Sequence, residues 1–539
     1  MADTDMAHDT AADGHMARRH MVTRVNVGDL LTRSAARAPN HVALIDGERR
    51  LTYRAFNDLA NRTAHGLASL GYGRGAVLAL MSGNSPEFLA TYFACAKLGV
   101  VCVPVNLFWQ RGELGYVLNH AAARGVVVEA ALLDQLRPAL GDSPGVLDIV
   151  VVGGDGAAVE GRRTLSFSDL GAGRPTAEPV ALVEDRDPLS YLYTSGTTSA
   201  PKAVVSSHLA VYVASLGAAL DAQFTSRDRV SALLPLFHTA QLNAVGTSAI
   251  AVGATLCLMR GFDAGRLLDA VASERLTVGF MLPMMVRAVL DALEAAPRDV
   301  SSLRLVIYAM APMPAHELRR AMDRLGCEFS LMFGQTEMNP LSVYFRPEHQ
   351  LSHAGAMGTP SVNVEVAILD AAGDPVAQGG SGEIAYRSPQ LLSGYLHDEA
   401  ATAAAFDGGW FHSGDAGHFD TDGILWFEDR FKDIIKTGGE NVASIEVEKA
   451  VYAADPDVGE VAVVGLPHGR WGEAVTAVVV PRPGASIDEA ALQARLREHL
   501  SAFKCPKRIV VTDAMPKTAT GKVQKAKLRV SLAGTYTGV

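Results

Sequence analysis

The chain has 539 residues but few cysteines, and nothing in their spacing pairs them. Its five cysteines are scattered and form no Cys-x-x-Cys motif, so the sequence supports neither a disulfide framework nor a zinc site. Thiols used in this way are typical of a reducing compartment, and we therefore expect the protein in the cytoplasm.

Long hydrophobic runs are also missing. The longest apolar run, near Ala249–Met259, is too short to span a bilayer, so we expect no membrane partner. The amino-terminal residues mix alanine, aspartate, histidine and methionine without the apolar core of a signal peptide. Residues 1–23 are therefore predicted to be a disordered tail.

The sequence lacks blocks of like charge. Its formal net charge of -10 is spread along the chain, which argues against a nucleic-acid partner, although an acidic protein can still bind anions locally. Hydrophobic residues make up 48% of the chain and charged residues 20%, the balance of a globular protein with large cores. The length requires at least two domains and predicts no particular oligomeric state.

Strand and helix patterns alternate through most of the chain. Thr52 is placed to cap a helix over 51–70, and buried strands are expected at 77–81 and 100–104 on either side of a helix over Pro86–Leu98. This βαβ rhythm predicts parallel sheets covered by helices.

The pattern changes toward the carboxyl end. Residues 358–426 carry frequent glycine turns between short alternating strands and are predicted to be β-rich. A compact αβ unit is expected from Lys432 onward. The predicted fold is α/β, with an amino-terminal domain over 24–431, built from two layered α/β subdomains and a distorted β-barrel, and a small mobile carboxyl-terminal domain over 432–532.

A loop rich in hydroxyl groups follows the apolar run that ends at Tyr193. Five serine and threonine hydroxyls surround a glycine, and Lys202 closes the loop. Hydroxyls, backbone N–H groups and a lysine all bind phosphate oxygens, so the loop is a candidate polyphosphate cradle. It is not a Walker A motif, because no Gly-Lys-Ser/Thr ends it. An ordinary polar turn between two strands is the alternative interpretation.

Further candidate residues occur downstream. His238 follows an apolar run over 231–236 that is expected to be a strand, a position suited to ligand contact, although taken alone such a residue is more often a structural histidine. The sequence Phe333–Glu337 combines a ring for a purine, a hydroxyl for phosphate and a carboxylate for Mg²⁺. Asp415 is suited to ribose hydroxyls, and Lys522 lies on a glycine-containing turn. Each of these segments taken singly is also compatible with a solvated loop.

The joint order of these segments resembles the adenylate-forming superfamily of acyl-CoA synthetases, peptide-synthetase adenylation domains and beetle luciferases. The resemblance extends from about Val27 to Leu528 and is closest to the ligases for small and medium acids, including carnitine-like acids. It implies ATP, Mg²⁺ and coenzyme A as cofactors, and predicts adenylation of a small or aromatic carboxylic acid with release of pyrophosphate, followed by transfer to coenzyme A.

The resemblance also implies a role for each matching residue. The phosphate-binding loop is expected to use Thr194, Ser195, Gly196, Thr197, Thr198 and Lys202. The adenine is expected to meet Ala311, Phe333, Gly334 and Gln335, and the α-phosphate Thr336. Glu337 and Thr197 are implied as metal ligands, and Asp415 and Arg430 as ribose ligands. The implied catalytic residues are His238, Thr336, Lys436, Asn441 and the adenylating Lys522, with Lys432 at a hinge.

The chemistry implied is nucleophilic attack by an oxyanion on the α-phosphorus of ATP. Mg²⁺ and Lys522 neutralise charge on the phosphates, and no general base is needed because a carboxylate is already ionised at neutral pH. The small domain then rotates so that a second nucleophile, often a thiol, can reach the adenylate.

The chain departs from the superfamily pattern at four positions. Ser199 and Ala203 stand where relatives commonly have glycine, and Ala309 and Met310 replace a pair of glycines beside the substrate tunnel. The larger side chains predict a shortened tunnel and a small or flat substrate.

Three alternatives stay open for the reaction. Relatives pass the adenylate to an amine or a carrier protein, and others adenylate nitrite and convert an aryl amine to a diazo group. A non-catalytic nucleotide-binding protein with the same fold is disfavoured, because both Glu337 and Lys522 are present.

Four basic residues near the carboxyl end are candidates for contact with coenzyme A phosphates, or for ordinary solvated surface: Lys504, Lys507, Arg508 and Lys517.

Overall fold

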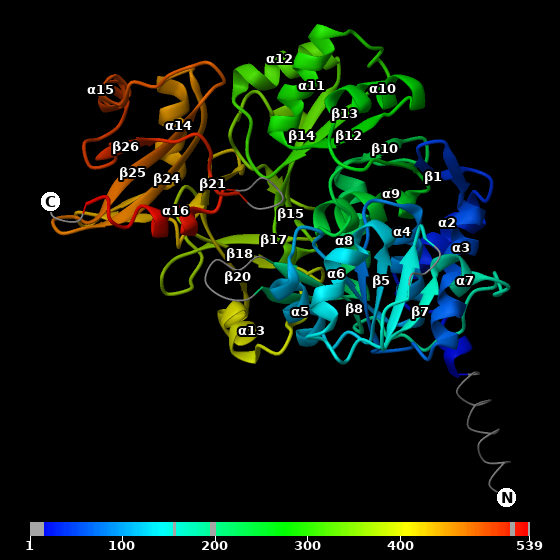
Figure 1. Ribbon diagram of the computed structural model, residues 1–539. Helices are drawn as coiled ribbons and strands as arrows, with labels where there is room; N and C mark the ends of the chain where they lie inside the picture. Colours follow the sequence, from blue (N-terminus) through cyan, green and yellow to red (C-terminus); the bar gives the residue numbers. More distant parts are fainter. Residues whose placement is uncertain (1–15, 155–157, 195–200, 518–522, 537–539) are drawn as a thin grey trace, which may run out of the picture. The chain divides into compact units, whose positions relative to one another are not determined.

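The computed structural model describes residues 16–154, 158–194, 201–517 and 523–536 (Figure 1). The chain divides into two compact units. The first contains the described residues up to Glu365 together with Arg387–Ala404, and the second contains Val366–Tyr386 and the described residues from Ala405 onward.

The larger sheet of the first unit has nine strands among the described residues, in the order β16-β15-β14-β13-β12-β10-β11-β1-β2. Its centre is parallel, and β2, β15 and β16 pair antiparallel at its two edges. The strands are β1 (Val42–Asp46), β2 (Arg49–Thr52), β10 (Arg229–Ala232), β11 (Thr255–Leu258), β12 (Val278–Met281), β13 (Leu305–Ala309), β14 (Glu328–Gly334), β15 (Leu341–Phe345) and β16 (Thr359–Pro360).

The second sheet of this unit has eight strands among those described, in the order β19-β9-β8-β4-β3-β5-β6-β7. It is parallel except at one edge, where β8, β9 and β19 pair antiparallel. The strands are β3 (Val77–Met81), β4 (Val101–Pro104), β5 (Gly125–Glu129), β6 (Asp148–Val152), β7 (Arg163–Ser166), β8 (Pro188–Thr194), β9 (Lys202–Ser207) and β19 (Gly394–Tyr395).

Helices separate and cover the two sheets. One continuous cluster of buried side chains has members from both sheets and from α3, α4, α8 and α9, so these helices lie between the sheets. The helices of this unit are α2 (Gly28–Arg37), α3 (Tyr53–Ser69), α4 (Pro86–Leu98), α5 (Arg111–His120), α6 (Leu133–Leu140), α7 (Phe167–Gly171), α8 (His208–Asp221), α9 (Thr247–Val252), α10 (Ala264–Glu274), α11 (Pro283–Ala295), α12 (Ala315–Leu325) and α13 (Glu399–Ala405).

Helix α4 shows how local sequence fixes these helices. The Ser85 hydroxyl accepts a hydrogen bond from the Phe88 N–H, Pro86 occupies the first turn, and Gly99 ends the helix in the left-handed conformation (φ 72°). Nearly every residue of α4 is buried, as expected for a helix that is apolar all round.

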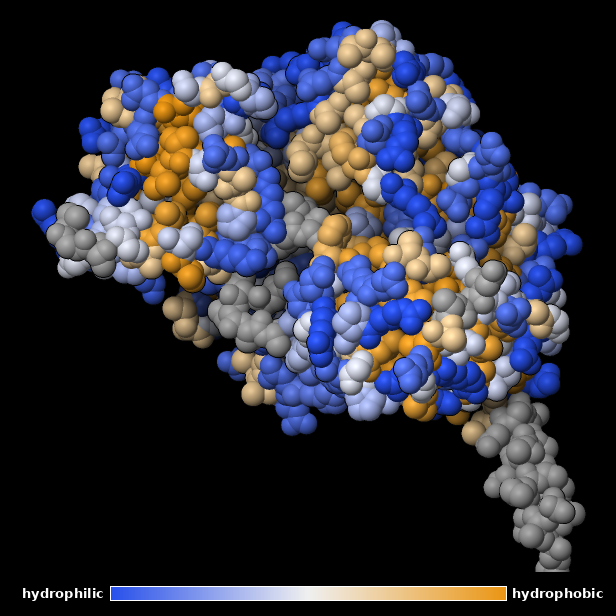
Figure 2. Space-filling model, viewed as in Figure 1, coloured by the Kyte–Doolittle hydropathy of each residue, from blue (hydrophilic) through white to orange (hydrophobic). Residues whose placement is uncertain are grey.

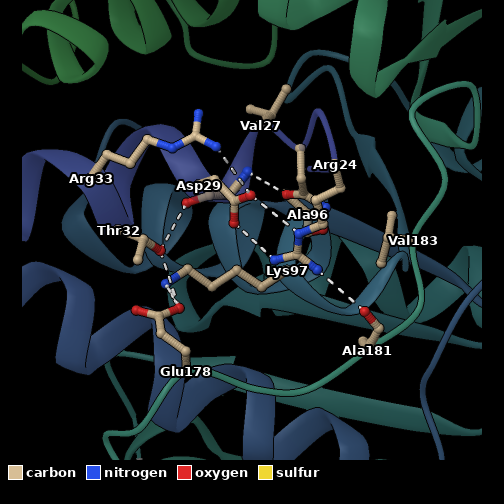
Figure 3. Close-up of polar contacts among 12 residues, drawn as sticks. Arg24, Val27, Asp29, Thr32, Arg33, Ala96, Lys97, Glu178, Ala181 and Val183 are labelled. Carbon is tan, nitrogen blue, oxygen red and sulfur yellow. Dashed lines mark hydrogen bonds and ion pairs between the residues drawn. The ribbon is translucent and has the colours of Figure 1, made fainter. Parts of the chain in front are cut away.

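The exception in α4 is Lys97, which is charged and yet buried. Its Nζ donates to Asn57 Oδ1, Asn61 Oδ1 and Glu178 Oε2, each at 2.7 Å. Figure 3 shows this lysine reaching Glu178, whose carboxylate also accepts a hydrogen bond from Thr32 at 3.1 Å. The three bonds satisfy the three donors of the ammonium group, which makes its burial tolerable.

Further polar contacts hold the irregular segment 176–183, which leads to β8. Arg24 forms a buried bidentate pair with Asp29 and donates to the carbonyl of Ala181, as drawn in Figure 3. The His20 ring nitrogen lies 2.8 Å from the carbonyl oxygen of Val183. Long-range polar contacts therefore replace regular secondary structure in this segment.

The second unit contains two sheets. The first is four-stranded among the described residues, in the order β17-β18-β20-β21, with strands β17 (Glu365–Leu369), β18 (Gly382–Arg387), β20 (Phe411–Phe419) and β21 (Leu425–Arg430). The second joins β23-β22-β25-β24, with β26 on β25, and its strands are β22 (Ile435–Thr437), β23 (Glu440–Val442), β24 (Val458–His468), β25 (Gly472–Pro481) and β26 (Arg508–Val511). The helices are α14 (Ser444–Ala454), α15 (Glu489–His499) and α16 (Lys525–Ser531).

Several expectations about local structure are confirmed and others are corrected. The Thr52 hydroxyl caps α3, and the β-rich segment is a sheet of four described strands in open order. The strand expected over 231–236 already ends at Ala232, because 233–238 turn toward a π-helix (Ala240–Gly246). Residues 16–20, expected in the tail, are helical. Within the described residues the second compact unit begins at Val366, and the domain boundary at Lys432 stays a prediction.

Candidate active site

The carboxyl ends of four neighbouring parallel strands bring candidate residues to one edge of the nine-stranded sheet. Strands β10, β12, β13 and β14 are adjacent, and their ends lead to His238, to the start of α11, to Met310 and to Phe333 respectively. Ligands of open parallel sheets bind at this edge, so the predicted residues lie where a nucleotide site is expected.

Residues Phe333–Glu337 pass from the end of β14 into a 3₁₀ turn, Thr336–Met338. Gly334 is required there, because a Cβ on this residue would lie 1.9 Å from the carbonyl oxygen of Pro340. The Gln335 side chain has its Nε2 buried without a hydrogen-bond partner in the described residues. A buried donor without a partner is expensive, and a ligand acceptor at this position would satisfy it.

His238 lies after the loop that follows β10. Its ring contacts Phe237, with centroids 4.6 Å apart, and its Nε2 is buried without a hydrogen-bond partner in the described residues. Burial lowers the pKa of His238 to about 4, so the ring is neutral at neutral pH. A neutral imidazole with a free nitrogen suits hydrogen bonding to a substrate better than charge pairing.

Met310 and Ala311 follow β13 and are both exposed. Met310 has a φ of 77°, a left-handed conformation that favours glycine, and its side chain is 58% exposed. Met310 therefore has a backbone conformation that glycine adopts more readily. It lies near the end of β14, because the preceding residue, Ala309, pairs with Met332.

The two flanks of the hydroxyl-rich loop pair with each other. Thr194 ends β8 and Lys202 begins β9, and these two residues are register partners in the antiparallel ladder. The loop is therefore closed at its base like a hairpin. Four predicted phosphate ligands lie outside the described residues: Ser195, Gly196, Thr197 and Thr198.

Tyr395 connects this loop to the predicted metal carboxylate. Its hydroxyl donates to Glu337 Oε1 at 3.1 Å, and the Lys202 ammonium lies 5.1 Å from the centre of its ring. Lys202 Nζ also lies 3.5 Å from Asp398 Oδ2. Neither Tyr395 nor Asp398 was predicted as a site residue, because more than 50 residues separate both from Glu337.

The predicted ribose ligands lie in the second unit. Asp415 on β20 and Arg430 on β21 are directly opposite each other, and Arg430 Nε lies 3.0 Å from Asp415 Oδ1. Asp415 is buried, so Arg430 forms an ion pair with a carboxylate that is shielded from bulk water. Burial and the neighbouring Arg430 charge lower the pKa of Lys432.

The remaining predicted catalytic residues also belong to this unit. Lys436 on β22 and Asn441 on β23 are register partners on either side of a tight turn, and both are exposed. The turn uses Gly438 and Gly439 at φ 61° and 88°, as a two-residue hairpin of this kind requires. Lys522 lies outside the described residues.

A cationic aromatic cluster borders the same hairpin. The Trp471 indole stacks on His468 at 4.2 Å between centroids, and Arg470 and Lys507 lie 5.7 and 5.1 Å from the centre of the indole ring. The Gly438 N–H donates to the Trp471 carbonyl at 2.8 Å, which ties the cluster to the turn. Two of the basic residues considered for coenzyme A instead form ion pairs: Lys504 with Glu446 and Lys517 with Glu460.

Figure 2 shows one face, on which hydrophobic residues form separate patches with hydrophilic residues between them. No helix in the described part of the chain has the length and apolar composition needed to cross a bilayer.

Comparison with models of known protein families identifies the family of this chain. It matches the model of the AMP-binding enzymes over residues 31–396, and the model of the AMP-binding enzyme C-terminal domain over residues 446–522. The chain therefore belongs to the AMP-binding enzyme family.

Similar proteins include ligases of aromatic acids. An indoleacetate–CoA ligase from Aromatoleum aromaticum is 34% identical over 517 residues, which cover 94% of this chain and 98% of that protein. A feruloyl-CoA synthase from Amycolatopsis sp is 34% identical over 507 residues, which cover 93% of this chain and 98% of that enzyme.

Among solved structures, the anthranilate CoA ligase AuaEII in complex with anthranoyl-AMP superposes with a TM-score of 0.85 at 29% identity, covering 94% of this chain and 97% of that one. The predicted superfamily, the α/β fold with a large amino-terminal and a small carboxyl-terminal domain, and the class of ATP-dependent, AMP-forming ligase of the acyl-CoA synthetase type are confirmed.

Proposed function

We propose that the enzyme adenylates a small or aromatic carboxylic acid with ATP and transfers the acyl group to coenzyme A. One observation carries this proposal. The Tyr395 side chain contacts both Glu337 and Lys202 at the base of the hydroxyl-rich loop. A carboxylate and an ammonium group that contact the same tyrosine are suited to a polyphosphate and its counter-ion. The similar ligases for indoleacetate, ferulate and anthranilate favour an aryl acid.

In the first step a carboxylate oxygen attacks the α-phosphorus of ATP, and the bond to the bridging oxygen of pyrophosphate breaks. Lys202 and the loop hydroxyls Thr194, Ser195, Thr197 and Thr198 hold the leaving group, while Thr336 binds the α-phosphate and Lys522 neutralises its developing charge. Phe333 packs on adenine beside Ala311, Gly334 and Gln335, and Asp415 and Arg430 take the ribose hydroxyls.

Mg²⁺ fits the donor set in this part of the chain. This ion is usually held by one or two carboxylates and by substrate phosphates, and Glu337 supplies one carboxylate, whose Oε1 accepts a hydrogen bond from Tyr395. We propose Glu337 as a ligand, with Thr197 as a second. When bound, Mg²⁺ supplies charge neutralisation for the triphosphate.

In the second step the thiol of coenzyme A attacks the acyl carbon of the adenylate. The C–O bond to AMP breaks, a C–S bond forms, and the thiol proton is released. We propose that the neutral His238 ring hydrogen bonds the acyl-adenylate and that Lys436 and Asn441 act in this step. The indole of Trp471 with Arg470 and Lys507 offers a surface for an aromatic base and phosphates, which supports coenzyme A as the acceptor.

Exchange of labelled pyrophosphate into ATP, measured over a panel of acids and nitrite, tests the adenylation step. We expect exchange with indoleacetate, ferulate or anthranilate, and a thioester product when coenzyme A is added. Lys522→Ala should lower exchange by about 10²-fold or more, and Trp471→Ala should raise the KM for coenzyme A without changing exchange.

Two results would redirect the proposal. Exchange that survives Lys522→Ala overturns the assignment of the adenylating lysine. Exchange with nitrite and a diazo product from an aryl amine, without exchange on any acid, replaces the acid ligase by a diazotase.

A further inference from the structure

The segment 392–398, which contains strand β19, bonds to both parts of the candidate phosphate site. The Leu392 N–H donates to the carbonyl of Glu337 at 2.8 Å, and the Leu396 N–H donates to the carbonyl of Ala203 at 2.9 Å. Residues Gly394 and Tyr395 also pair as strand β19 with β9, the strand that begins at Lys202. The backbone of this segment therefore joins Glu337 to the end of the hydroxyl-rich loop.

The Tyr395 side chain lies at the centre of this connection. Its hydroxyl donates to Glu337 Oε1 at 3.1 Å, and its ring faces the Lys202 ammonium at 5.1 Å from the ring centre. A hydrogen bond to one carboxylate oxygen fixes the rotamer of that carboxylate and leaves the other oxygen for a ligand. The ring at the same time favours a cation on its face.

Asp398 holds Lys202 from a second direction. Its Oδ2 lies 3.5 Å from Lys202 Nζ, and its Oδ1 accepts a hydrogen bond from the Ala401 N–H at 2.9 Å, which anchors the carboxylate at the start of α13. Gly394 fixes the entry to this segment, because it has a φ of 153° and a Cβ there would lie 3.0 Å from Thr402 Cγ2.

The other flank of the loop is reached by a neighbouring residue. His397, which has a φ of 56°, contacts the His120 ring at 5.3 Å between centroids. His120 Nδ1 in turn lies 2.9 Å from the hydroxyl of Tyr193, the residue before Thr194. The segment 392–398 therefore contacts Glu337 and one flank of the loop directly, and it reaches the other flank through His120.

We propose that Tyr395 is a positioning residue that holds Glu337 and Lys202 at the spacing needed by a metal-bound triphosphate. The role rests on the proposed function, because it needs Glu337 and Lys202 to bind the nucleotide. Tyr395 acts through these two residues and not on the reacting atoms. Loss of its hydroxyl weakens the contribution of the metal to nucleotide binding, while the ring keeps its contact with Lys202.

Binding of a non-cleavable ATP analogue, α,β-methylene ATP, to the full chain tests this role without turnover. Tyr395→Phe should weaken binding in the presence of Mg²⁺ by about tenfold, in line with loss of a hydrogen bond to a metal ligand. Binding measured in a chelator should change by less than about twofold, because the hydroxyl acts through the carboxylate. Tyr212→Phe is the matched control, since it removes a tyrosine hydroxyl that accepts from Arg33, and should change neither value.

A double-mutant cycle with Glu337→Gln separates positioning from packing. In the Glu337→Gln background, Tyr395→Phe should add less than about twofold, because two residues acting through one contact are not additive. An undiminished tenfold loss in that background, or wild-type binding by Tyr395→Phe, overturns the positioning role while leaving adenylation intact. A wild-type chain that binds the analogue under neither condition contradicts the proposed function, and the positioning role with it.

Discussion

Two lysines of the first unit have similar partners and opposite surroundings. The Lys97 side chain is 1% exposed and donates to three acceptors at 2.7 Å, whereas the Lys202 side chain is 46% exposed and its nearest carboxylate is 3.5 Å away. All donors of Lys97 are satisfied within the fold, so this lysine is structural. Lys202 keeps donors directed to solvent, which leaves its charge available to a ligand.

The titration behaviour of the buried pair follows from this difference. Burial lowers the pKa of Lys97, against the opposing attraction of Glu178. Burial alone would raise the pKa of Glu178, but Lys97 and hydrogen bonds from Asn57 and Asn61 outweigh it and hold the pKa below its usual value. The Glu178 contribution to stability is therefore present above about pH 4.5 and is lost as the pH falls through the folded-state pKa.

The largest effect on stability is expected from Lys97→Met. Removing one partner of a buried pair leaves Glu178 facing an apolar group, and the expected loss in the free energy of unfolding is about 3 kcal/mol. Because a chain with two compact units need not unfold in one step, the first transition in a thermal melt is the quantity to compare. Adding Glu178→Leu should restore part of the loss.

Acid should narrow the gap between the wild type and Lys97→Met. Once its partner is gone, burial raises the pKa of Glu178, so protonation below about pH 4.5 relieves the variant while it weakens the wild type. Melts recorded from neutral pH downward measure this. A gap that stays constant or widens would show that Lys97 does not stabilise Glu178.

Lys202→Met should have the converse effect. We expect kcat/KM for ATP in pyrophosphate exchange to fall by about 10²-fold, because a charge that binds the leaving group is lost. The first melting transition should move by less than about 1 °C, since surface substitutions are usually neutral for stability. Lys97→Met serves as the counterpart: its folded fraction should exchange at the wild-type rate. Loss of stability in Lys202→Met would mean that both lysines are structural.

Met310→Gly should give the smallest effect, and in the stabilising direction. A glycine relieves the left-handed conformation at φ 77°, with an expected gain of about 1 kcal/mol. The exposed side chain is also removed, so longer acids should enter the exchange panel. Met284→Ala is the control, because Met284 is 55% exposed but helical. An unchanged acid range would show that Met310 does not limit the substrate.

Local signals predicted those parts of the molecule in which neighbours in sequence interact. The cap at Thr52 and the strand over 77–81 depend on a few adjacent residues, and both are present. The Lys97–Glu178 pair and the Tyr395–Glu337 bond join residues 81 and 58 positions apart, so no local pattern shows them. The strand expected over 231–236 ends early, because its later apolar residues turn toward a π-helix. Hydrophobic periodicity does not distinguish such a turn from a continuing strand.

The most direct test of the central claim follows an oxygen atom from substrate to product. If a carboxylate attacks the α-phosphorus, an acid labelled with heavy oxygen in its carboxylate transfers one labelled atom to AMP during turnover with ATP and coenzyme A. We predict singly labelled AMP with indoleacetate, ferulate or anthranilate, whichever supports exchange. Unlabelled AMP formed together with the thioester would contradict adenylation of the acid.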